Sequence, residues 1–343
     1  MFELEIAEVV KETNDTISVS FIVPEELKEN FEYTPGQYMT FEAIIDGEKI
    51  RRSYSLCSNP YAGEQPRVAI KRVNGGRFSN FANDHFTAGG SVNVLSPRGN
   101  FVANVAPWNA KQYILFAAGS GITPILSILK AVLSQEPNSK VKLVYANSNT
   151  ENIIFDQEIN EQLKSSNDSL QRIDHISSIK GRLSAEDVVE YSGGESNATY
   201  FMCGPQGFME TIESALVSSG VSAEKINKEY FQAKQKNEPA QLEVEELSDE
   251  IIDRDVVVVV DGEEKTIHVP ADENILEAAI DNDMDPPYSC QAGVCTTCRA
   301  MCVSGKVMMD ESEGLSEEEI EEGYVLACQA HPLTDNVRLE FTL

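Results

Sequence analysis

Positive charge and long apolar runs are both scarce in this sequence of 343 residues. It has 27 Lys and Arg against 56 Asp and Glu, a formal net charge of −29, which makes nucleic acid an implausible partner. No run approaches the roughly 18 apolar residues that mark a membrane span. The first six residues lack the basic start of a secretory signal. We therefore expect a cytoplasmic protein with neither a nucleic acid nor a membrane as partner.

Histidine is rare as well, and its positions are scattered along the chain. No Ser/His or Cys/His arrangement indicates nucleophilic catalysis, because none of the histidines has clustered partners. We expect all of them to be structural or exposed; they are His85, His175, His268 and His331.

Four of the seven cysteines follow a defined spacing near the C-terminus. Four residues separate Cys290 from Cys295, two separate Cys295 from Cys298, and 29 precede Cys328. This is the C-x4-C-x2-C…C pattern of a plant-type [2Fe–2S] cluster, in which two sulfide-bridged irons take two thiolates each. Two cysteines outside this spacing are expected to be small packing residues; they are Cys57 and Cys302.

Zinc and disulfides are the alternatives to an iron–sulfur cluster. Structural zinc sites usually pair two short C-x2-C knuckles, whereas Cys328 stands alone. A disulfide framework fits poorly with an odd cysteine count and a long chain. A loop around a cluster must also turn sharply and aim its N–H groups at sulfur, which Gly293 and its small neighbours permit.

The length suggests two or three domains, and the rhythm of the sequence changes accordingly. Residues 1–105 are short β-branched or aromatic runs between turn residues, which favours an antiparallel β-barrel or a sandwich; we expect the barrel. Residues 106–232 alternate strands and helices, as in a parallel α/β domain. Residues 233–252 are polar and aperiodic, like a linker. Residues 253–343 combine a strand hairpin, a helix and the cysteine loop, which fits an α+β, β-grasp ferredoxin domain.

Two weak motifs lie in the first stretch. Arg52-Ser53-Tyr54-Ser55 ends an expected strand, and Gly75-Gly76 leads into a helix that begins near Phe78 and contains Ser79. Two glycines, a hydroxyl and the N–H groups of a helix start suit a phosphate. Taken singly, such a Gly-Gly pair is more often a hairpin turn, and Arg-Ser-Tyr-Ser is more often plain strand.

Two further motifs lie in the α/β stretch. Gly119-Ser-Gly121 directly follows an expected strand, and Pro124 suits the first turn of the helix after it, so the backbone can pass close to a pyrophosphate. Without a third glycine this motif is unspecific. Cys203-Gly204-Pro205 likewise ends a strand at a glycine and starts a helix at a proline.

In this order, and ahead of plant-type cysteines, the motifs resemble those of the ferredoxin–NADP reductase superfamily with a C-terminal [2Fe–2S] domain. The resemblance covers essentially the whole chain and is greatest to the reductase component of bacterial multicomponent oxygenases, in particular that of phenylacetyl-CoA epoxidase. It implies an NAD(P)H:acceptor oxidoreductase that passes electrons from NADH or NADPH through FAD to the cluster. An oxygenase or hydroxylase protein, in aromatic or phenylacetyl-CoA catabolism, would be the acceptor.

The resemblance also implies roles for individual residues on the flavin side. Arg52 would meet the flavin pyrophosphate, Tyr54 would pack on the isoalloxazine, and Ser55 would lie near flavin N5. Gly76 and Ser79, at the helix start, would bind the pyrophosphate of FAD.

On the nicotinamide side, the resemblance places Cys203 near the nicotinamide ring. Phe231 is the candidate for the aromatic ring that the nicotinamide displaces. The residues expected to bind the dinucleotide are Gly119, Gly121, Thr123, Gly204 and Pro205.

One departure from the family pattern concerns the choice of coenzyme. Tyr145-Ala-Asn-Ser148 stands where the epoxidase reductases commonly have Tyr-Gly-Asn-Arg, so an arginine expected to meet a 2′-phosphate is absent. Arg182 would either replace it or be a surface cation at a helix start. The choice between NADH and NADPH therefore stays open.

Two other functions fit the same motifs: a stand-alone reductase of small acceptors such as ferricyanide or free flavin, and a redox sensor without steady turnover. The motifs for a complete electron route from NAD(P)H through FAD to the cluster argue against the sensor, because a sensor without turnover needs no such route. Residues 253–343 hold 21 Asp and Glu against 5 Lys and Arg. This acidic surface would either steer a basic protein partner or serve only solubility.

Overall fold

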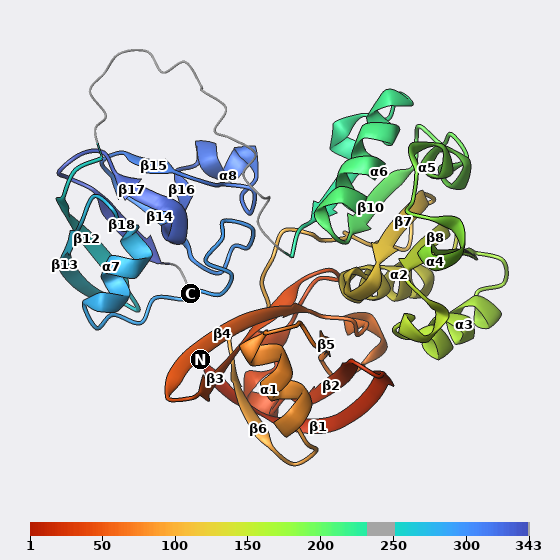
Figure 1. Ribbon diagram of the computed structural model, residues 1–343, viewed down its shortest axis with the longest axis horizontal. Helices are drawn as coiled ribbons and strands as arrows, with labels where there is room; N and C mark the ends of the chain where they lie inside the picture. The colour runs from red at the N-terminus through yellow and green to blue at the C-terminus, as the bar shows by residue number, and fades with distance from the viewer. Residues whose placement is uncertain (232–250, 342–343) are drawn as a thin grey trace. The chain divides into compact units, whose positions relative to one another are not determined.

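The computed structural model describes residues 1–231 and 251–341 (Figure 1). The chain divides into two compact units, residues 1–231 and residues 232–343. The linker predicted over 233–252 lies outside the described residues, except for its last two positions. Within the described ranges, no helix is both long and apolar enough to cross a membrane.

A six-stranded antiparallel sheet in the order β4-β3-β6-β1-β2-β5 forms the N-terminal part of the first unit. Its edge strands meet through a bridge between Leu56 and Val68 and through the Cys57 N–H, which donates to the Arg67 carbonyl at 2.8 Å. This closure removes the open edges and confirms the expected barrel. Its strands are β1 (Phe2–Thr13), β2 (Thr16–Ile22), β3 (Tyr38–Ile45), β4 (Glu48–Ser55), β5 (Arg67–Lys71) and β6 (Ser91–Val94).

Alternating apolar side chains from these strands fill the barrel, including Leu4, Val19 and Phe41, all fully buried. Helix α1 (Arg77–His85) adds Phe78 and Ala82 to the same core. The helix start is thereby fixed relative to the barrel. Three 3₁₀ turns complete this part: η1 (Glu25–Leu27), η2 (Glu29–Phe31) and η3 (Pro60–Ala62).

A five-stranded parallel sheet in the order β11-β10-β7-β8-β9 forms the rest of the first unit. The order reverses between β7 and β10, and such a switch point opens a ligand crevice at the carboxyl ends of the strands. The strands are β7 (Gln112–Ala118), β8 (Lys140–Asn147), β9 (Leu170–Ile176), β10 (Thr199–Cys203) and β11 (Ile226–Glu229). The helices are α2 (Ile122–Gln135), α3 (Asp156–Ser165), α4 (Ser177–Lys180), α5 (Ala185–Ser192) and α6 (Gln206–Ser218), with 3₁₀ turns η4 (Gly119–Gly121), η5 (Thr150–Asn152) and η6 (Ala223–Lys225).

The second unit contains a mixed five-stranded sheet in the order β13-β12-β18-β14-β16. β12 and β13 form a hairpin whose turn, Asp261-Gly262, has positive φ at both residues, as a tight two-residue turn requires. Helix α7 (Ile275–Asp281) buries Ile275, Leu276 and Ala279 in the core of this unit. The expected α+β class is confirmed. The other elements are β12 (Arg254–Val260), β13 (Glu263–Val269), β14 (Arg299–Ser304), β15 (Val307–Met309), β16 (Tyr324–Leu326), β17 (Ala330–Pro332), β18 (Arg338–Phe341), α8 (Glu317–Glu321) and η7 (Ala327–Gln329).

A cluster of ion pairs joins the barrel to the parallel-sheet part of the first unit. Lys130 of α2, only 4% exposed, donates to Glu64 at 2.5 Å and to Glu158 of α3 at 2.8 Å. Arg67 of β5 donates to Glu158 at 2.5 Å and lies 5.1 Å above the Phe155 ring. Glu158 thus forms ion pairs with residues from both halves of the unit.

Replacing Glu158 by Gln is expected to destabilise the protein by about 2 kcal/mol at pH 7, because two cations lose their shared partner. Burial by itself raises the pKa of Glu158, but Arg67 and Lys130 outweigh it and hold that pKa below its ordinary value. This contribution to stability is therefore present above about pH 4.5 and is lost as the pH falls further.

Urea unfolding at pH 7 and pH 4 measures the effect of the Glu158→Gln change. Exposed Glu161 of the same helix supplies the control, Glu161→Gln, whose midpoint should stay close to that of the wild type. Equal losses of stability in Glu158→Gln at both pH values would contradict the electrostatic explanation.

Candidate functional site

The end of β4 carries the first group of candidate residues. The Tyr54 ring lies 5.8 Å from the Phe78 ring of α1 and 6.0 Å from the Phe41 ring in the barrel core. Burial raises the pKa of the Tyr54 hydroxyl, which stays neutral at physiological pH. Ser55 is buried at the strand end, and Arg52 is exposed. Tyr54 therefore links the strand to the start of the helix.

The start of α1 is built around Gly76. A Cβ at Gly76 would lie 2.6 Å from the Ser79 hydroxyl and 2.9 Å from the Val73 side chain, so no larger residue fits. The Val73 N–H donates to the Ser79 hydroxyl at 3.1 Å. Ser79 thus holds the loop in shape, and the N–H groups of the first helical turn remain suited to an anion.

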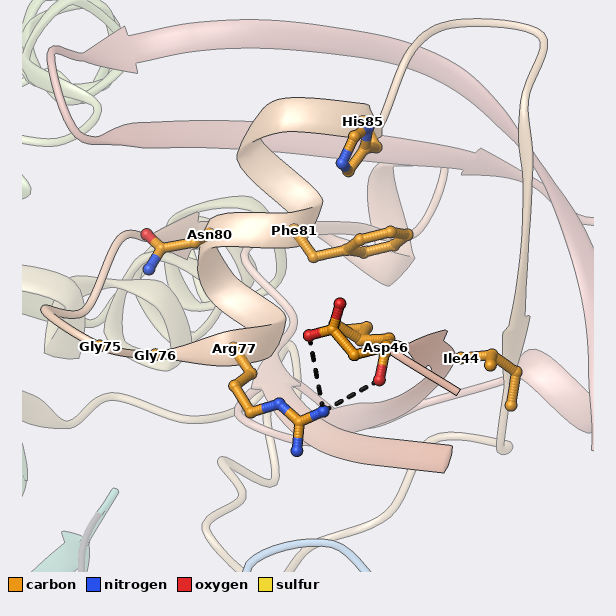
Figure 2. Close-up of a pocket in the computed structure, with 9 residues that line it drawn as sticks. Ile44, Asp46, Gly75, Gly76, Arg77, Asn80, Phe81 and His85 are labelled. Atoms are coloured by element: carbon orange, nitrogen blue, oxygen red, sulfur yellow. Dashed lines mark hydrogen bonds and ion pairs between the residues drawn. The ribbon is translucent and has the colours of Figure 1, made fainter. Parts of the chain in front are cut away.

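A pocket of about 470 Å³ adjoins this helix start (Figure 2). The rings of Phe81 and His85, one helical turn apart on α1, lie 4.7 Å from each other at its wall. Arg77 closes another side, where it donates to the Ile45 carbonyl at 2.9 Å and pairs with Asp46 and Glu48. This pocket was not predicted from the sequence; its only signal was the i, i+4 spacing of the two rings.

The chain that leaves β4 is attached directly to α2. The Ser127 hydroxyl donates to the Ser58 carbonyl at 2.7 Å, and the Asn59 amide donates to the Lys130 carbonyl at 3.3 Å and to Ser134 at 3.0 Å. The flavin-side motif and the glycine turn before α2 are therefore held in one framework.

The glycine turn between β7 and α2 packs tightly against the end of β10. A Cβ at Gly121 would lie 2.1 Å from the Cys203 carbonyl oxygen, and one at Gly204 would lie 2.9 Å from the Ala118 Cβ. Gly119 instead has a positive φ of 53° and open space around its missing Cβ. Gly121 is thus required by packing, a reason that the sequence pattern does not reveal.

The other candidate residues of the nicotinamide side lie near the carboxyl ends of the strands of the parallel sheet. The Thr123 hydroxyl donates to the Ser120 carbonyl at 3.0 Å, which fixes the first turn of α2. Pro205 is the N-cap of α6. Cys203 is fully buried, and burial, reinforced by the nearby Glu229, raises the pKa of its thiol. Phe231, two residues after the strand partner of Cys203, is 42% exposed.

Ser148 and Arg182 follow neighbouring strands, β8 and β9. Both are exposed. The Ser178 N–H donates to the Ser148 carbonyl at 3.1 Å, so the segments after the two strands are tied together. Arg182 comes one residue after Gly181, which has a positive φ of 82°.

In the second unit, the four spaced cysteines lie as two pairs. The Cys295 thiol donates to Cys290 at 3.1 Å, and the Cys298 thiol donates to Cys328. Nowhere in residues 1–231 and 251–341 do three or more His, Cys, Asp and Glu side chains gather as they would around one metal ion. None of the seven cysteines, all of which lie in the described residues, forms a disulfide. Two pairs fit two irons that take two thiolates each.

Hydrogen bonds prepare one cysteine of each pair to be a thiolate. The Cys295 thiol, together with nearby backbone N–H groups, lowers the pKa of Cys290 to about 6 although burial opposes this. The Cys298 thiol lowers the pKa of Cys328 in the same way. The same hydrogen bonds, together with burial, raise the pKa values of the donors Cys295 and Cys298 well above the ordinary value. Each pair therefore shares one proton, which it must give up when all four sulfurs bind metal.

Two glycines shape the cysteine loop. Gly293 has a positive φ of 73°, and a Cβ there would lie 2.6 Å from the Glu311 side chain. A Cβ at Gly314 would lie 2.9 Å from the Cys295 carbonyl oxygen, and the Gly314 N–H donates to the Gly293 carbonyl at 2.8 Å. The loop is thereby held close to the segment after β15, a contact between distant residues that spacing alone does not indicate.

Most of the remaining cysteines and histidines are paired with nearby backbone or carboxylate groups; in contrast, the buried Nδ1 of His331 has no hydrogen-bond partner among the described residues. Cys57 is buried and donates to the Arg67 carbonyl at 3.2 Å, and Cys302 donates to the Ser304 carbonyl at 3.4 Å. His175 is buried with Nε2 3.0 Å from the Gly181 carbonyl. His268 is exposed beside Asp255, and His331 faces Asp310. His85, in contrast, lines the pocket on α1.

Three known domain families match successive parts of the chain. Residues 3–102 match an oxidoreductase FAD-binding domain, residues 115–214 an oxidoreductase NAD-binding domain, and residues 258–333 a 2Fe-2S iron-sulfur cluster binding domain. FAD and a [2Fe–2S] cluster are therefore the cofactors, and NAD(P)H is the electron donor.

Curated relatives and solved structures extend over the same length. The chain is 36% identical to the ferredoxin reductase component of 3-ketosteroid-9-alpha-monooxygenase from Rhodococcus rhodochrous, covering 98% of this chain and 96% of that protein. It is 35% identical to one of the subunits of 1,2-phenylacetyl-CoA epoxidase from Escherichia coli (strain K12), over 98% and 97% of the two chains.

Among solved structures, phthalate dioxygenase reductase superimposes with a TM-score of 0.61 at 23% identity, covering 99% of this chain and 98% of that one. An intact type IV self-sufficient cytochrome P450 monooxygenase gives a TM-score of 0.71 at 19% identity; this chain covers 40% of its length. Both likenesses concern the fold. The chain belongs to the ferredoxin–NADP reductase-like family of FAD- and NAD(P)H-dependent oxidoreductases that carry a C-terminal plant-type [2Fe–2S] domain.

Proposed function

We propose that this oxidoreductase is the reductase component of an oxygenase system and delivers its electrons to a separate oxygenase or hydroxylase protein. The observation that carries the proposal is 35–36% identity, over nearly the whole length, to components of two different systems, a monooxygenase and an epoxidase. FAD, when bound, accepts two electrons as a hydride from NAD(P)H and releases them singly, as a one-electron [2Fe–2S] acceptor requires.

On the flavin side, each candidate residue has a task that fits its position. The N–H groups of the first turn of α1, shaped by Gly76 and Ser79, would hold the pyrophosphate of FAD, and exposed Arg52 would neutralise it. Tyr54, anchored to Phe78, would support one face of the isoalloxazine. The Ser55 hydroxyl at the strand end would hydrogen-bond near flavin N5.

On the nicotinamide side, the turn at Gly119 and Gly121 would hold the pyrophosphate of the dinucleotide at the start of α2, where Thr123 fixes the first turn. The end of β10, with Cys203-Gly204-Pro205, would face the nicotinamide. Burial keeps the Cys203 thiol neutral, so it would contact the ring without adding charge. Phe231 would cover the flavin until the nicotinamide takes its place.

In the second unit, Cys290 and Cys295 would ligate one iron, and Cys298 and Cys328 the other, as their pairing suggests. The acidic surface of residues 253–343 supports an acceptor with a basic docking face. We further propose a cytoplasmic location, which the lack of disulfides among the described cysteines supports.

The substrate of the oxygenase is a separate question from the electron transfer. The relatives belong to a 3-ketosteroid monooxygenase and a phenylacetyl-CoA epoxidase, so related chains serve chemically different systems. We propose phenylacetyl-CoA or a related aromatic compound as the class of substrate, supported by the 35% identity to the epoxidase subunit.

Anaerobic stopped-flow mixing of the purified holoenzyme with NADH tests the relay. Rapid bleaching of the flavin, followed by bleaching of the cluster, is the expected result. The rate of NAD(P)H oxidation is then measured with an oxygenase protein and with small acceptors. A higher rate with the oxygenase supports a protein partner. A flavin that neither NADH nor NADPH reduces would contradict the proposal and favour a redox sensor.

Ser148 leads us to expect faster reduction by NADH than by NADPH, because no guanidinium stands at that position to meet a 2′-phosphate. The Ser148→Arg variant should raise kcat/KM for NADPH about tenfold with little change for NADH. Arg182→Ala is the companion variant: a selective loss of NADPH activity would show that Arg182 already performs this role. Steady-state kinetics with both coenzymes gives the ratios, and an unchanged ratio in Ser148→Arg would contradict the expectation.

A further inference from the structure

Gln329 directly follows Cys328, and its side-chain amide faces three acceptors. The Nε2 atom lies 2.8 Å from the Cys328 carbonyl oxygen, 3.7 Å from the Cys328 sulfur and 3.5 Å from the Gln291 carbonyl oxygen. These neighbours determine which end of the amide points toward them, because two oxygens and a sulfur would all repel the amide oxygen. Gln329 is therefore an N–H donor to the cysteine site.

Gln291 belongs to the loop that carries the other three spaced cysteines. It has a positive φ of 53°, which is uncommon for a residue with a side chain, and its own side chain is exposed. The N–H of the next residue, Ala292, donates to the Cys290 sulfur at 3.4 Å. The turn at Gln291 thus aims a backbone N–H at one sulfur while its carbonyl accepts from Gln329. Gln329 thereby ties the loop of three cysteines to the fourth.

The backbone of Gln329 is held firmly enough to present this amide. Gln329 ends the 3₁₀ turn η7, whose Ala327 and Cys328 are buried in the core of the second unit. The Asp310 N–H donates to the Gln329 carbonyl at 3.0 Å. A buried and hydrogen-bonded element therefore presents the donor to an exposed part of the loop.

A donor to the Cys328 sulfur becomes more important when the cysteines bind metal. In the protein without metal, the Cys298 thiol donates to Cys328. Once both sulfurs are ligands, neither carries a proton, so N–H groups must supply the hydrogen bonds. The Gly293 backbone N–H and the Gln329 amide are the donors in place at the Cys328 sulfur.

Hydrogen bonds to ligand sulfurs raise the reduction potential of an iron–sulfur cluster, because reduction adds negative charge that a donor stabilises. Nearby carboxylates have the opposite effect. Residues 253–343 hold 21 Asp and Glu against 5 Lys and Arg, and the Glu311 side chain lies beside Gly293. A neutral donor at Cys328 offsets part of this effect without adding a charged group.

We propose that Gln329 is a positioning residue of the iron–sulfur site: its amide closes the cysteine loop onto Cys328 and raises the reduction potential of the bound cluster. A higher potential favours the transfer of single electrons from flavin to the cluster. The proposal rests on the ligation of iron by Cys328 and adds to it a residue outside the four cysteines.

Anaerobic redox titration of the holoenzyme, followed by the absorbance and the electron paramagnetic resonance signal of the cluster, tests the proposal. Gln329→Met keeps the length of the side chain and removes the donor. The equilibrium constant for one-electron reduction of the cluster should fall about tenfold, which is about 59 mV. An iron chelator should also remove the cluster about tenfold faster, because the loop has lost its tie to Cys328.

Two further variants separate the donor from other effects of the change. Gln291→Met removes an exposed amide of the same loop and keeps its carbonyl, so it is the matched control and should behave as the wild type in both measurements. Gln329→Lys restores an N–H donor of similar reach and should have a potential no lower than that of the wild type.

A wild-type potential in Gln329→Met would overturn the proposal, even with faster loss of iron, because it would show a purely structural role. The same lowered potential in Gln291→Met or in Gln329→Lys would also overturn it. Should Gln329→Met assemble no cluster, Gln329→Asn gives an independent answer. Its amide is one methylene shorter, so its potential should be lowered, and a wild-type potential would contradict the proposal. An unchanged cluster in Cys328→Ser would instead count against the ligand assignment.

Discussion

Replacement of Cys298 by Ser should abolish electron transfer through the cluster while leaving NAD(P)H-dependent reduction of ferricyanide close to the wild-type rate. Cys298 pairs with Cys328, and a serine hydroxyl is a poor substitute for a thiolate on iron. Reduction of a one-electron protein acceptor such as cytochrome c should therefore fall by roughly two orders of magnitude. Ferricyanide takes electrons from flavin, which depends only on residues of the first unit.

Cys302 provides the matched control for this prediction. It is a half-buried cysteine four residues further on that lies outside the ligand spacing; its thiol donates to nearby carbonyl groups and packs against the core of the second unit. Cys302→Ser should keep the cluster absorbance, the iron content and both activities. A folded Cys298→Ser protein that has lost both activities would contradict the separation of the flavin relay from the cluster.

Replacement of Gly121 by Ala should have the largest effect among the nicotinamide-side residues. The added methyl group would lie 2.1 Å from the Cys203 carbonyl oxygen, so the turn before α2 and the end of β10 must move apart. Overpacking of this kind costs about 2–3 kcal/mol of stability. Because we propose that the same turn holds the dinucleotide, affinity for NAD⁺ should fall about tenfold or more.

Gly119→Ala separates packing from backbone strain at the same turn. Its Cβ meets open space, so only the positive φ opposes an alanine, at about 1 kcal/mol. Urea unfolding gives the two losses of stability, and calorimetric titration with NAD⁺ gives the affinity of Gly121→Ala. A Gly121→Ala protein no less stable than Gly119→Ala would contradict the packing argument.

Local patterns in the sequence predicted most of the fold. The β-branched runs and turn residues of the first 105 residues, and the alternation that follows, appear as barrel strands and as a parallel sheet with its helices. Several elements escaped prediction, among them α4 and β14 to β18, and for two others, β11 and α5, there is a physical reason. β11 reads Ile-Asn-Lys-Glu and is an edge strand that is only partly buried, so its sequence contains no apolar run. α5 begins at a capping box formed by Ser184 and Asp187, and this short motif is too weak a signal to predict a helix by itself.

The candidate site was predictable only as far as its residues belong to motifs. The cysteine spacing and the glycine turns can be read from the chain, whereas the pocket on α1 depends on contacts between segments far apart in sequence. The requirement for Gly121 likewise arises from a residue 82 positions away, Cys203. Such requirements come from tertiary packing and leave no local signal.

Residues 56–59 connect the barrel to the parallel-sheet part of the first unit and should couple their folding. The same short segment closes the barrel through Leu56 and Cys57 and then anchors α2 through Ser58 and Asn59. The closure of the barrel and the attachment of α2 therefore both depend on the order of this one segment. The barrel and the nucleotide-binding sheet should consequently form and melt as one cooperative body.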